Sequence, residues 1–246
     1  MPSPAAVEFL AYDVAFVQDT PPALTPWERS EVDRLWAQTR ALTPETFDGP
    51  LAVTLGVDSV GSDAPVVRWA AMTYRDRALR RLWPAERVPG SLFVTVLLPT
   101  ESGLVVGRGS PTTAAPGRWT LPGGAAEPPP SGAPLDIEVL RRHAARELAE
   151  EIGIHVDDKT LRLWALTRGN RFGSLGFHFL CPRTSSALVR GLHSEQSVAQ
   201  VGHGVTPELD EIDFVPSPIM VSRLGPTADY LPQVVDRYFT ADRLKR

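Results

Sequence analysis

The sequence predicts a mixed α/β fold, in which helices cover a mixed β-sheet. Segments rich in strand-forming residues recur along its 246 residues, and stretches of helical periodicity separate them. No internal repeat and no coiled-coil heptad interrupts this alternation. A chain of this length can bury a large core, either as one domain or as a domain with a smaller addition.

The composition limits the classes of function. The formal net charge of -4 argues against unspecific nucleic-acid binding, which needs a basic surface. A single cysteine, Cys181, excludes an intramolecular disulfide and a zinc site built from cysteines. The sequence has no signal-peptide pattern and no apolar run of membrane length, so we expect a soluble protein of a reducing compartment, the cytoplasm.

The first elements are predicted by strand-forming residues and by a helix-capping pattern. Residues 6–17 have the sequence AVEFLAYDVAFV, which favours a strand, and the breaker QDTPP follows. A helix is then predicted for residues 25–42, where Thr25 suits the N-cap, Pro26 suits the first turn and Glu28 completes a capping box. The apolar positions of this helix roughly follow helical spacing, and we expect them in the core: Trp27, Val32, Leu35 and Trp36.

Two strands and a short helix are predicted next. The stretches GPLAVTLGV at 49–57 and PVVRWAAMTY at 65–74 favour strands, and the turn residues DSVGSDA separate them. The stretch RDRALRRLW at 75–83 favours a short helix, and a Pro-Gly pair follows it. We therefore expect a small N-terminal α/β region, residues 1–88, and a main domain, residues 89–246.

The main domain begins with a predicted hairpin and an irregular loop. The stretches SLFVTVLLP at 91–99 and GLVVGRG at 103–109 favour two strands joined by a turn. RWTLPGG then ends in a glycine pair, and AAEPPPSGAP cannot form regular structure because its consecutive prolines lack backbone donors. A helix is predicted for residues 136–152, with Gly153 as its left-handed cap. The last predicted elements are strands at 161–167, 175–181 and 211–216 and a helix within 227–239.

Three glutamates crowd the end of the predicted 136–152 helix. Glu147, Glu150 and Glu151 are three or four residues apart, so they share a face beside the apolar one. Like charges at this spacing repel, and the C-terminal end of a helix disfavours anions. Mg²⁺ and Mn²⁺ bind such hard oxygen ligands, so a metal site would account for the crowding. A solvated helix face is the alternative.

The glutamates belong to a longer pattern. RELAEEIGI at 146–154 is preceded by Glu138, with seven residues between Glu138 and Arg146, and by LPGG further upstream. Together these resemble the Nudix box: Gly, five residues, Glu, seven residues, then Arg-Glu-aliphatic-x-Glu-Glu-x-Gly-aliphatic. Gly132 has the spacing of the first glycine, but family members usually carry this glycine in a PGG at the end of a strand. We therefore interpret Gly124 as the equivalent residue and the excess residues after it as an inserted loop.

The resemblance implies an α/β/α sandwich around a mixed sheet and a site for divalent cations, Mg²⁺ or Mn²⁺. The residues expected to hold the cations are Glu147, Glu150, Glu151 and Gly124, the last through its carbonyl or a close backbone approach. Arg146 would orient the glutamates through an ion pair with Glu138. Gly153 has the structural role of ending the helix.

The resemblance also implies hydrolysis of the diphosphate linkage in a nucleoside diphosphate linked to another group. Divalent cations neutralise a diphosphate and lower the pKa of the attacking water. The general base would be a box glutamate or an acid after the box, where TPELDEIDF supplies Glu208, Asp210 and Glu211. Glu211 is our candidate, and a solvated turn is the alternative.

Substrate-binding residues are expected shortly after the box, in TRGNRFGS. Arg168 and Arg171 could bind phosphates, and Phe172 or Phe177 could stack on a base, although Phe177 also suits a core strand. ADP-ribose-type Nudix enzymes often carry a proline in this region and diadenosine-polyphosphate types a tyrosine. Neither residue is present here.

The N-terminal region contains FDGP and TYRD, which resemble the UDP-sugar diphosphatase branch, unless Phe47 and Tyr74 simply pack that region. We therefore expect a nucleotide sugar such as a UDP-sugar as substrate. The alternatives are an ADP-ribose or dinucleotide pyrophosphatase, and a Nudix-fold module that binds a nucleotide or nucleotide sugar without turnover. The resemblance also allows a homodimer, for which the sequence specifies no interface.

Overall fold

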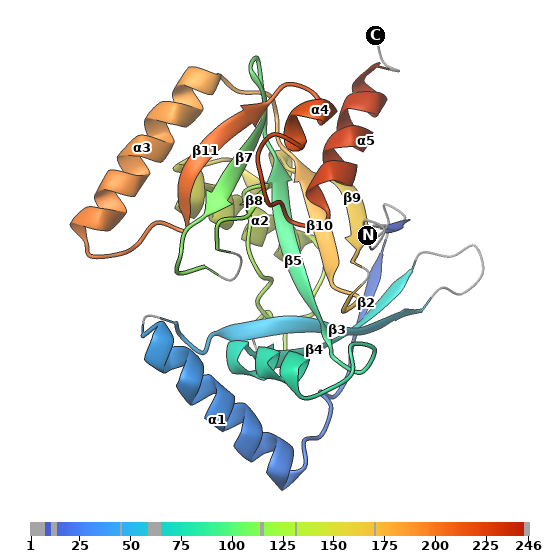
Figure 1. Ribbon diagram of the computed structural model, residues 1–246. Coiled ribbons are helices and arrows are strands. Elements are labelled where there is room, and N and C mark those ends of the chain that lie inside the picture. The colour runs from blue at the N-terminus through green and yellow to red at the C-terminus, as the bar shows by residue number, and fades with distance from the viewer. Residues whose placement is uncertain are drawn as a thin grey trace.

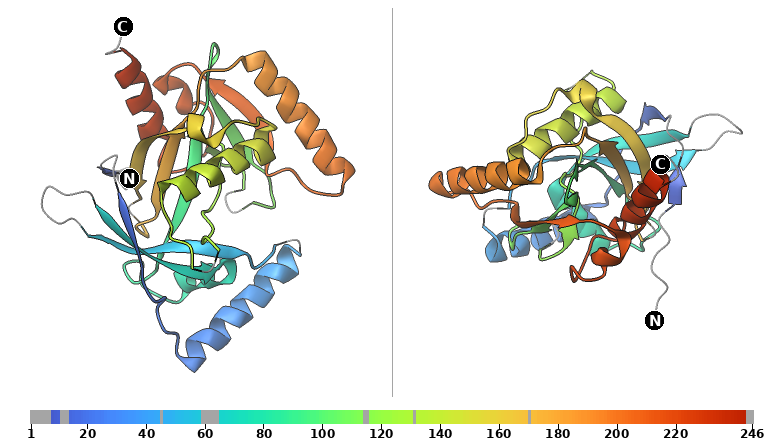
Figure 2. Two further views of the ribbon diagram at one scale, coloured as in Figure 1. Left: turned by 180° about the vertical axis from the view of Figure 1, so that it is seen from behind. Right: turned by 90° about the horizontal axis from the view of Figure 1, so that it is seen from above.

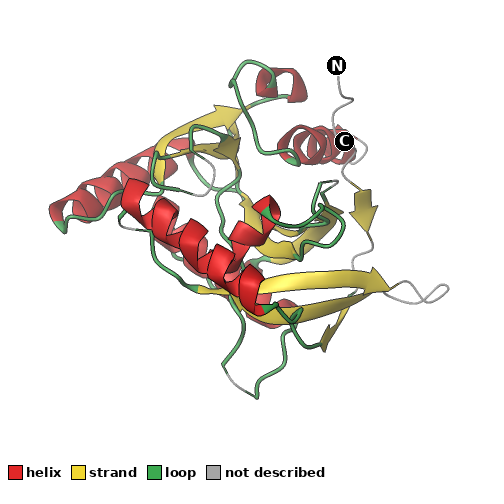
Figure 3. Cartoon of the chain, turned by 60° about the horizontal axis from the view of Figure 1, so that its bottom comes forward, coloured by secondary structure: helices red, strands yellow, loops and turns green. Residues whose placement is uncertain are grey.

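The computed structural model describes residues 8–10, 14–44, 46–58, 65–113, 116–130, 132–169 and 171–243. In this part of the chain two β-sheets lie between helices, which confirms the predicted mixed α/β fold (Figure 1). Figure 3 distinguishes helices, strands and loops by colour and shows helices on both sides of the strands. Among the helices described there, none is both long and apolar enough to pass through a membrane.

The larger sheet combines strands from both halves of the sequence. Its seven described strands follow the order β1-β9-β10-β5-β3-β4-β2. They are β1 (Glu8–Leu10), β2 (Ala15–Gln18), β3 (Pro50–Asp58), β4 (Val66–Thr73), β5 (Gly90–Leu97), β9 (Arg162–Arg168) and β10 (Leu175–Leu180). β5 runs parallel to β10, and β2 runs parallel to β4, whereas the other neighbours are antiparallel. The sheet is therefore mixed, as predicted.

The two halves of the sequence meet where β3 pairs with β5. The register of this pair aligns Val53 with Ser91. The apolar core also continues from one half into the other, since Trp69 and Leu92 belong to the same buried cluster. The sheet thus crosses the predicted boundary at residue 88, and the division into two domains stays a prediction.

The smaller sheet has the order β11-β7-β6, and β8 pairs with β7. Its strands are β6 (Pro99–Thr100), β7 (Gly103–Gly109), β8 (Trp119–Thr120) and β11 (Leu209–Val215). The predicted hairpin is confirmed only next to its turn, where Pro99, the last residue of the predicted strand, pairs with Leu104. The rest of that strand, β5, pairs with β3 and β10 and not with β7. β5 is apolar on both faces, with Val94 in one buried cluster and Leu97 in another, and such a strand belongs inside a covered sheet. The chain passes from one sheet to the other at fully buried Leu98.

Helix α1 (Pro26–Leu42) begins with the predicted capping box. The Thr25 hydroxyl accepts the backbone N–H of Glu28, and the Glu28 carboxylate accepts the N–H of Thr25. The indole N–H of Trp83 also donates to Glu28, over 2.7 Å. This bond connects α1 to the segment after the 3-10 helix η1 (Tyr74–Arg81), which forms where a short helix is predicted.

The capping box predicts a measurable contribution of Thr25 to stability. Thr25→Ala removes the hydroxyl that accepts the N–H of Glu28, and we expect the free energy of unfolding to fall by about 1 kcal/mol. Urea unfolding curves measure this loss. Thr39→Ala in the same helix is the control, because the Thr39 hydroxyl only bonds back to the Leu35 carbonyl and alanine has the higher helix propensity. Equal losses in both variants would contradict the capping role.

The apolar face of α1 is narrower than the sequence predicts. Val32 and Leu35 are buried as expected, and half-buried Trp36 contacts the ring of Tyr74, with 6.2 Å between centroids. The prediction for Trp27 is wrong, since this residue is 65% exposed. Val32 follows Trp27 by five positions, which turns the two side chains about 140° apart around the helix. Trp27 therefore points away from the face that packs on η1.

Helices α2 (Ile137–Ile152) and α5 (Leu231–Arg243) cover opposite sides of the sheets (Figure 1 and Figure 2). α2 packs through fully buried Leu140 and Leu148, and short α4 (Pro218–Val221) precedes α5. The long helix α3 (Ser186–Gly202) lies between β10 and β11, where no helix is predicted from the sequence. It packs beside α2 and β11.

The glycine pair before α2 lies against β5. The backbone N–H groups of Val94 and Val96 donate to the carbonyls of Gly124 and Pro122. Residues 121–126 therefore run antiparallel along β5, and the described residues of the loop that follows have no regular structure, as predicted. Because α2 also packs on β5, this arrangement brings the glycine pair next to α2.

Candidate metal centre

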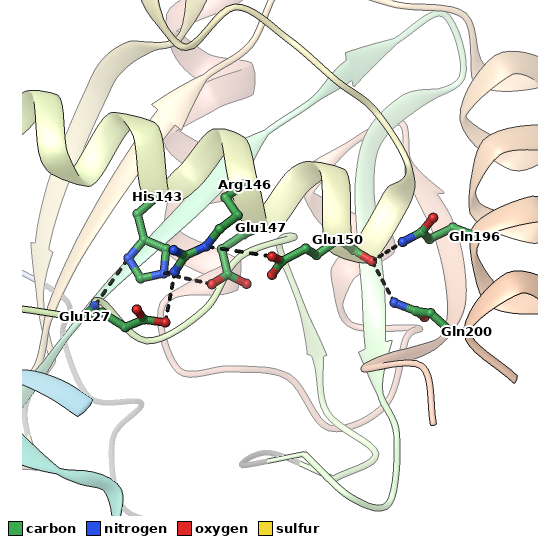
Figure 4. A network of polar contacts seen from close by, with 7 residues as sticks. All are labelled: Glu127, His143, Arg146, Glu147, Glu150, Gln196 and Gln200. Atoms are coloured by element: carbon green, nitrogen blue, oxygen red, sulfur yellow. Dashed lines mark hydrogen bonds and ion pairs between the residues drawn. The ribbon is translucent and has the colours of Figure 1, made fainter. Parts of the chain in front are cut away.

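Both ends of α2 are fixed by identifiable contacts. The Asp136 carboxylate caps the first turn by accepting the N–H of Val139, and Gly153 ends the helix with φ 78°, as predicted. Two side chains of α3, Gln196 and Gln200, donate to the backbone carbonyl of Glu150 over 3.1 and 3.0 Å (Figure 4). The helix that carries the glutamates is therefore anchored at the turn where they lie.

The three box glutamates differ in their surroundings. Glu151 is buried, and its Oε2 accepts the backbone N–H of Gly123 over 2.7 Å. Burial, and next the negative charge of Glu147, raise the pKa of Glu151 well above its ordinary value. The side chain of Glu147 is 12% exposed and that of Glu150 is 60% exposed. Partial burial and the charge of Glu147 also raise the pKa of Glu150, whereas Arg146 lowers it.

The expected close backbone approach is found at Gly124. A Cβ atom on this residue would lie 2.6 Å from the carboxyl atoms of Glu147, so the carboxylate would have to move. The carbonyl of Gly124 also accepts the N–H of Val94. A Cβ on Gly132, by contrast, would meet no atom within 4 Å. Of the two candidate glycines, Gly124 is the one beside Glu147.

The ion pair predicted between Arg146 and Glu138 is wrong. Arg146 Nη2 lies 2.9 Å from Glu127 Oε1, in the loop before α2, and its Nε lies 3.8 Å from Glu150 Oε1. Glu138 instead lies 3.7 Å from Arg141. Eight residues along an α-helix correspond to about 12 Å of rise, which separates Glu138 from Arg146. Arg146 still connects the loop to the helix, through Glu127.

The acidic segment after α3 contributes a different residue from the one expected. Glu211 and Asp210 both pair with Arg108 on β7, at 3.1 and 3.0 Å. Glu208 keeps contact with solvent, yet partial burial and then the charges of Glu147 and Glu150 raise its pKa. The influence of both charges indicates that Glu208 lies in the neighbourhood of the box glutamates. Glu208 therefore replaces Glu211 as the candidate acid after the box.

The expected substrate-binding residues form a separate group. The guanidinium carbons of Arg80 and Arg171 each lie 4.9 Å from the centroid of the Phe172 ring, so arginines already cover this ring. Burial, and next Arg77, lower the pKa of Arg80 to about 10. Arg168 ends β9 and is exposed. Among the described residues, no hydrogen bond or ion pair connects Arg168, Arg171 or Phe172 to the box glutamates. Phe177 is fully buried beside Phe16, so stacking of Phe177 on a base is excluded.

The carboxylate oxygens of Glu147, Glu150 and Glu151 are ligands of the type that a hard divalent cation prefers. In the part of the chain that is described, no three acidic, histidine or cysteine side chains are already gathered around one point at metal-ligand spacing. Mutual repulsion opposes a closer arrangement of these carboxylates, and a divalent cation would offset it. Burial, and then the charge of Glu147, raise the pKa of Glu151, and the missing side chain of Gly124 makes room for the Glu147 carboxylate.

No protein-family model and no curated protein matches the sequence. Among solved structures, a MutT protein from Methanosarcina mazei Go1 is similar, with a TM-score of 0.42 and 18% identity over 62% of this chain and 94% of that one. A Nudix hydrolase from M. smegmatis, RenU, gives 0.34 and 15%, over 65% and 88%. A bifunctional NMN adenylyltransferase/ADP ribose pyrophosphatase from Francisella tularensis, complexed with AMP and Mn ion, gives 0.43 and 12%, over 68% and 45%. These values are too low to transfer an activity, so the function has to be inferred from the site.

Proposed function

We propose that the chain is a Nudix hydrolase that uses Mg²⁺ or Mn²⁺ to cleave the diphosphate linkage of a nucleoside diphosphate joined to another group. One observation carries this proposal: Glu147 and Glu151, on one side of α2, both contact the glycine pair, Gly123 and Gly124. Gly124 leaves room for one carboxylate, and the N–H of Gly123 holds the other. The box motif RELAEEIGI supports the same conclusion independently.

Each residue of the site has a role in this proposal. Glu147, Glu150 and Glu151 would hold the cation, whose chemistry there is to neutralise the diphosphate and to activate water. Arg146 binds Glu127 and so restrains the loop beside the glutamates. Glu208 accepts the proton of the attacking water, because it reaches solvent and its raised pKa brings it closer to neutral pH.

The close approach at Gly124 predicts a strong effect of a single methyl group. Gly124→Ala would place a Cβ 2.6 Å from the Glu147 carboxyl atoms and displace that carboxylate. We expect the affinity for Mn²⁺ to fall by about 10- to 100-fold, measured by titration calorimetry on metal-free protein. Gly191→Ala on α3 is the control, since a Cβ there meets no atom within 4 Å. Unchanged Mn²⁺ affinity in Gly124→Ala would rule out this role.

The preferred substrate in our proposal is a nucleotide sugar such as a UDP-sugar. Support comes from the FDGP and TYRD motifs, although the contact between Tyr74 and Trp36 gives Tyr74 a packing role as well. Phe47 is 74% exposed, so burial does not explain this residue. A cytoplasmic location and a homodimer stay predictions.

A substrate panel tests the proposal. Nucleotide release is measured with Mg²⁺ on UDP-glucose, UDP-galactose, ADP-ribose, NADH, coenzyme A, diadenosine polyphosphates and nucleoside triphosphates, with EDTA as the control. Turnover of UDP-sugars that EDTA abolishes is the expected result. EDTA-sensitive turnover of another compound would keep the hydrolase and reject the UDP-sugar. No turnover, combined with a ligand that raises the melting temperature, would favour the binding module without turnover.

A further inference from the structure

His143 lies on α2, one turn before Glu147, at a position that the Nudix box does not specify. Its side chain is 5% exposed. Nε2 of the ring lies 3.0 Å from Glu147 Oε1, and Nδ1 lies 3.3 Å from the backbone nitrogen of Glu127 (Figure 4). The ring thus stands between a proposed metal ligand and the start of the proline-rich loop.

The partners of the ring determine where its proton lies. The backbone N–H of Glu127 can only donate, so Nδ1 accepts, and the proton of the neutral ring is on Nε2. The nearest acceptor for this N–H is the Glu147 carboxylate, whose Oε1 lies 3.0 Å from Nε2. Nη2 of Arg146 also lies 2.7 Å from Nε2, and because a guanidinium group can only donate, two donors face each other there. The acceptor for Arg146 is therefore Glu127 Oε1, at 2.9 Å.

The contacts on Glu147 restrict its carboxylate from two sides. Gly124 approaches it from the strand segment along β5, and His143 approaches it from the preceding turn of α2. A carboxylate with one oxygen bound to an N–H donor presents its other oxygen to a cation. Such outer hydrogen bonds fix the orientation of a metal ligand and change its affinity for the metal.

We infer that His143 is a positioning residue, which orients Glu147 for the divalent cation and couples this ligand to the loop at Glu127. The inference rests on the proposed function, because it assigns Glu147 to the metal site. Glu127 is bound to α2 twice, through its N–H to His143 and through its carboxylate to Arg146. A displacement of the loop would therefore act on Glu147 through the imidazole ring.

Two near-isosteric variants separate the two contacts of the ring. In His143→Gln the amide nitrogen takes roughly the place of Nε2 and keeps a donor for Glu147. In His143→Asn the amide oxygen takes roughly the place of Nδ1, so the bond to Glu127 is kept and the contact with Glu147 is lost. The measurement is the dissociation constant for Mn²⁺ of metal-free protein without substrate, from the electron paramagnetic resonance signal of free Mn²⁺. His203→Asn, at the exposed end of α3, is the control.

The inference predicts that His143→Asn weakens Mn²⁺ binding by about 10- to 100-fold, whereas His143→Gln stays within about threefold of the wild type. Melting curves of the metal-free variants report whether each one folds. Wild-type affinity in His143→Asn would overturn the inference, and so would equal weakening in both variants, which indicates packing alone. If the wild type itself binds no Mn²⁺, the proposed function fails, and the two failures are thereby distinguished.

Discussion

Glu151→Gln is expected to lower turnover by about a thousandfold or more, which corresponds to the several kcal/mol that a catalytic metal site supplies. The amide retains an oxygen that can accept the N–H of Gly123, so the local structure is kept. What the variant loses is the negative charge, which a divalent cation needs in its ligand. Turnover is measured on the best substrate of the panel, at saturating Mg²⁺.

Glu195→Gln on α3 is the matched control, because Glu195 is exposed and lies outside the proposed site. We expect its turnover to equal that of the wild type. Undiminished turnover in Glu151→Gln would show that Glu151 is not a metal ligand. The interpretation requires that the circular dichroism spectra of both variants match the wild type.

The same variant has a predicted effect on stability in EDTA. Burial, and then Glu147, raise the pKa of Glu151 well above 4.5, so the folded protein binds this proton more tightly than the unfolded chain. Ionisation of Glu151 therefore opposes folding as the pH rises, and glutamine removes this contribution. The variant should match the wild type below about pH 4.5 and become the more stable protein at higher pH. Urea unfolding in EDTA between about pH 4 and 8 measures this, and a less stable variant at pH 8 would contradict it.

Glu208→Gln is expected to lower kcat by about 100-fold or more, the usual contribution of a general base. The binding of Mn²⁺ should change little, because Glu208 is proposed to act on the water and not on the cation. Single-turnover kinetics and Mn²⁺ titration separate these two effects. The comparison variant is Glu211→Gln, which removes only one of the two partners of Arg108 and should keep most of the turnover. A larger loss in Glu211→Gln would restore Glu211 as the candidate base.

The parts of the fold that could be predicted are those that local sequence determines. The capping box of α1 and the glycine cap of α2 depend on residues within one turn of the helix ends, and both form as predicted. α3 was not predicted although Ser185 caps its first turn, because Gly191 interrupts its sequence and, of its described residues, only Val189 is buried. β7 pairs with β6 because β5, which is covered on both faces, belongs to the other sheet. No local sequence pattern specifies how the strands divide between the two sheets.

The proposed ligands of the candidate site come from the sequence, whereas the contacts around them come from the fold. The box motif identified Glu147 and Glu151, because their spacing along one helix is written in the sequence. The partner of Arg146 is Glu127, and the path of the loop before α2 brings it there. His143 lies four residues before Glu147 on the same helix, so its place beside Glu147 follows from the sequence. The bond between His143 and Glu127 and the approach of Glu208 depend on tertiary packing, which the sequence does not specify.

The central claim is that the glutamates of α2 hold a divalent cation. Crystals of the protein with Mn²⁺, measured at a wavelength where manganese scatters anomalously, locate the ion directly. We predict an anomalous peak bound by the carboxylates of Glu147 and Glu151, beside Gly124. Anomalous density elsewhere, with these carboxylates free of metal in a protein that still hydrolyses its substrate, would contradict the claim.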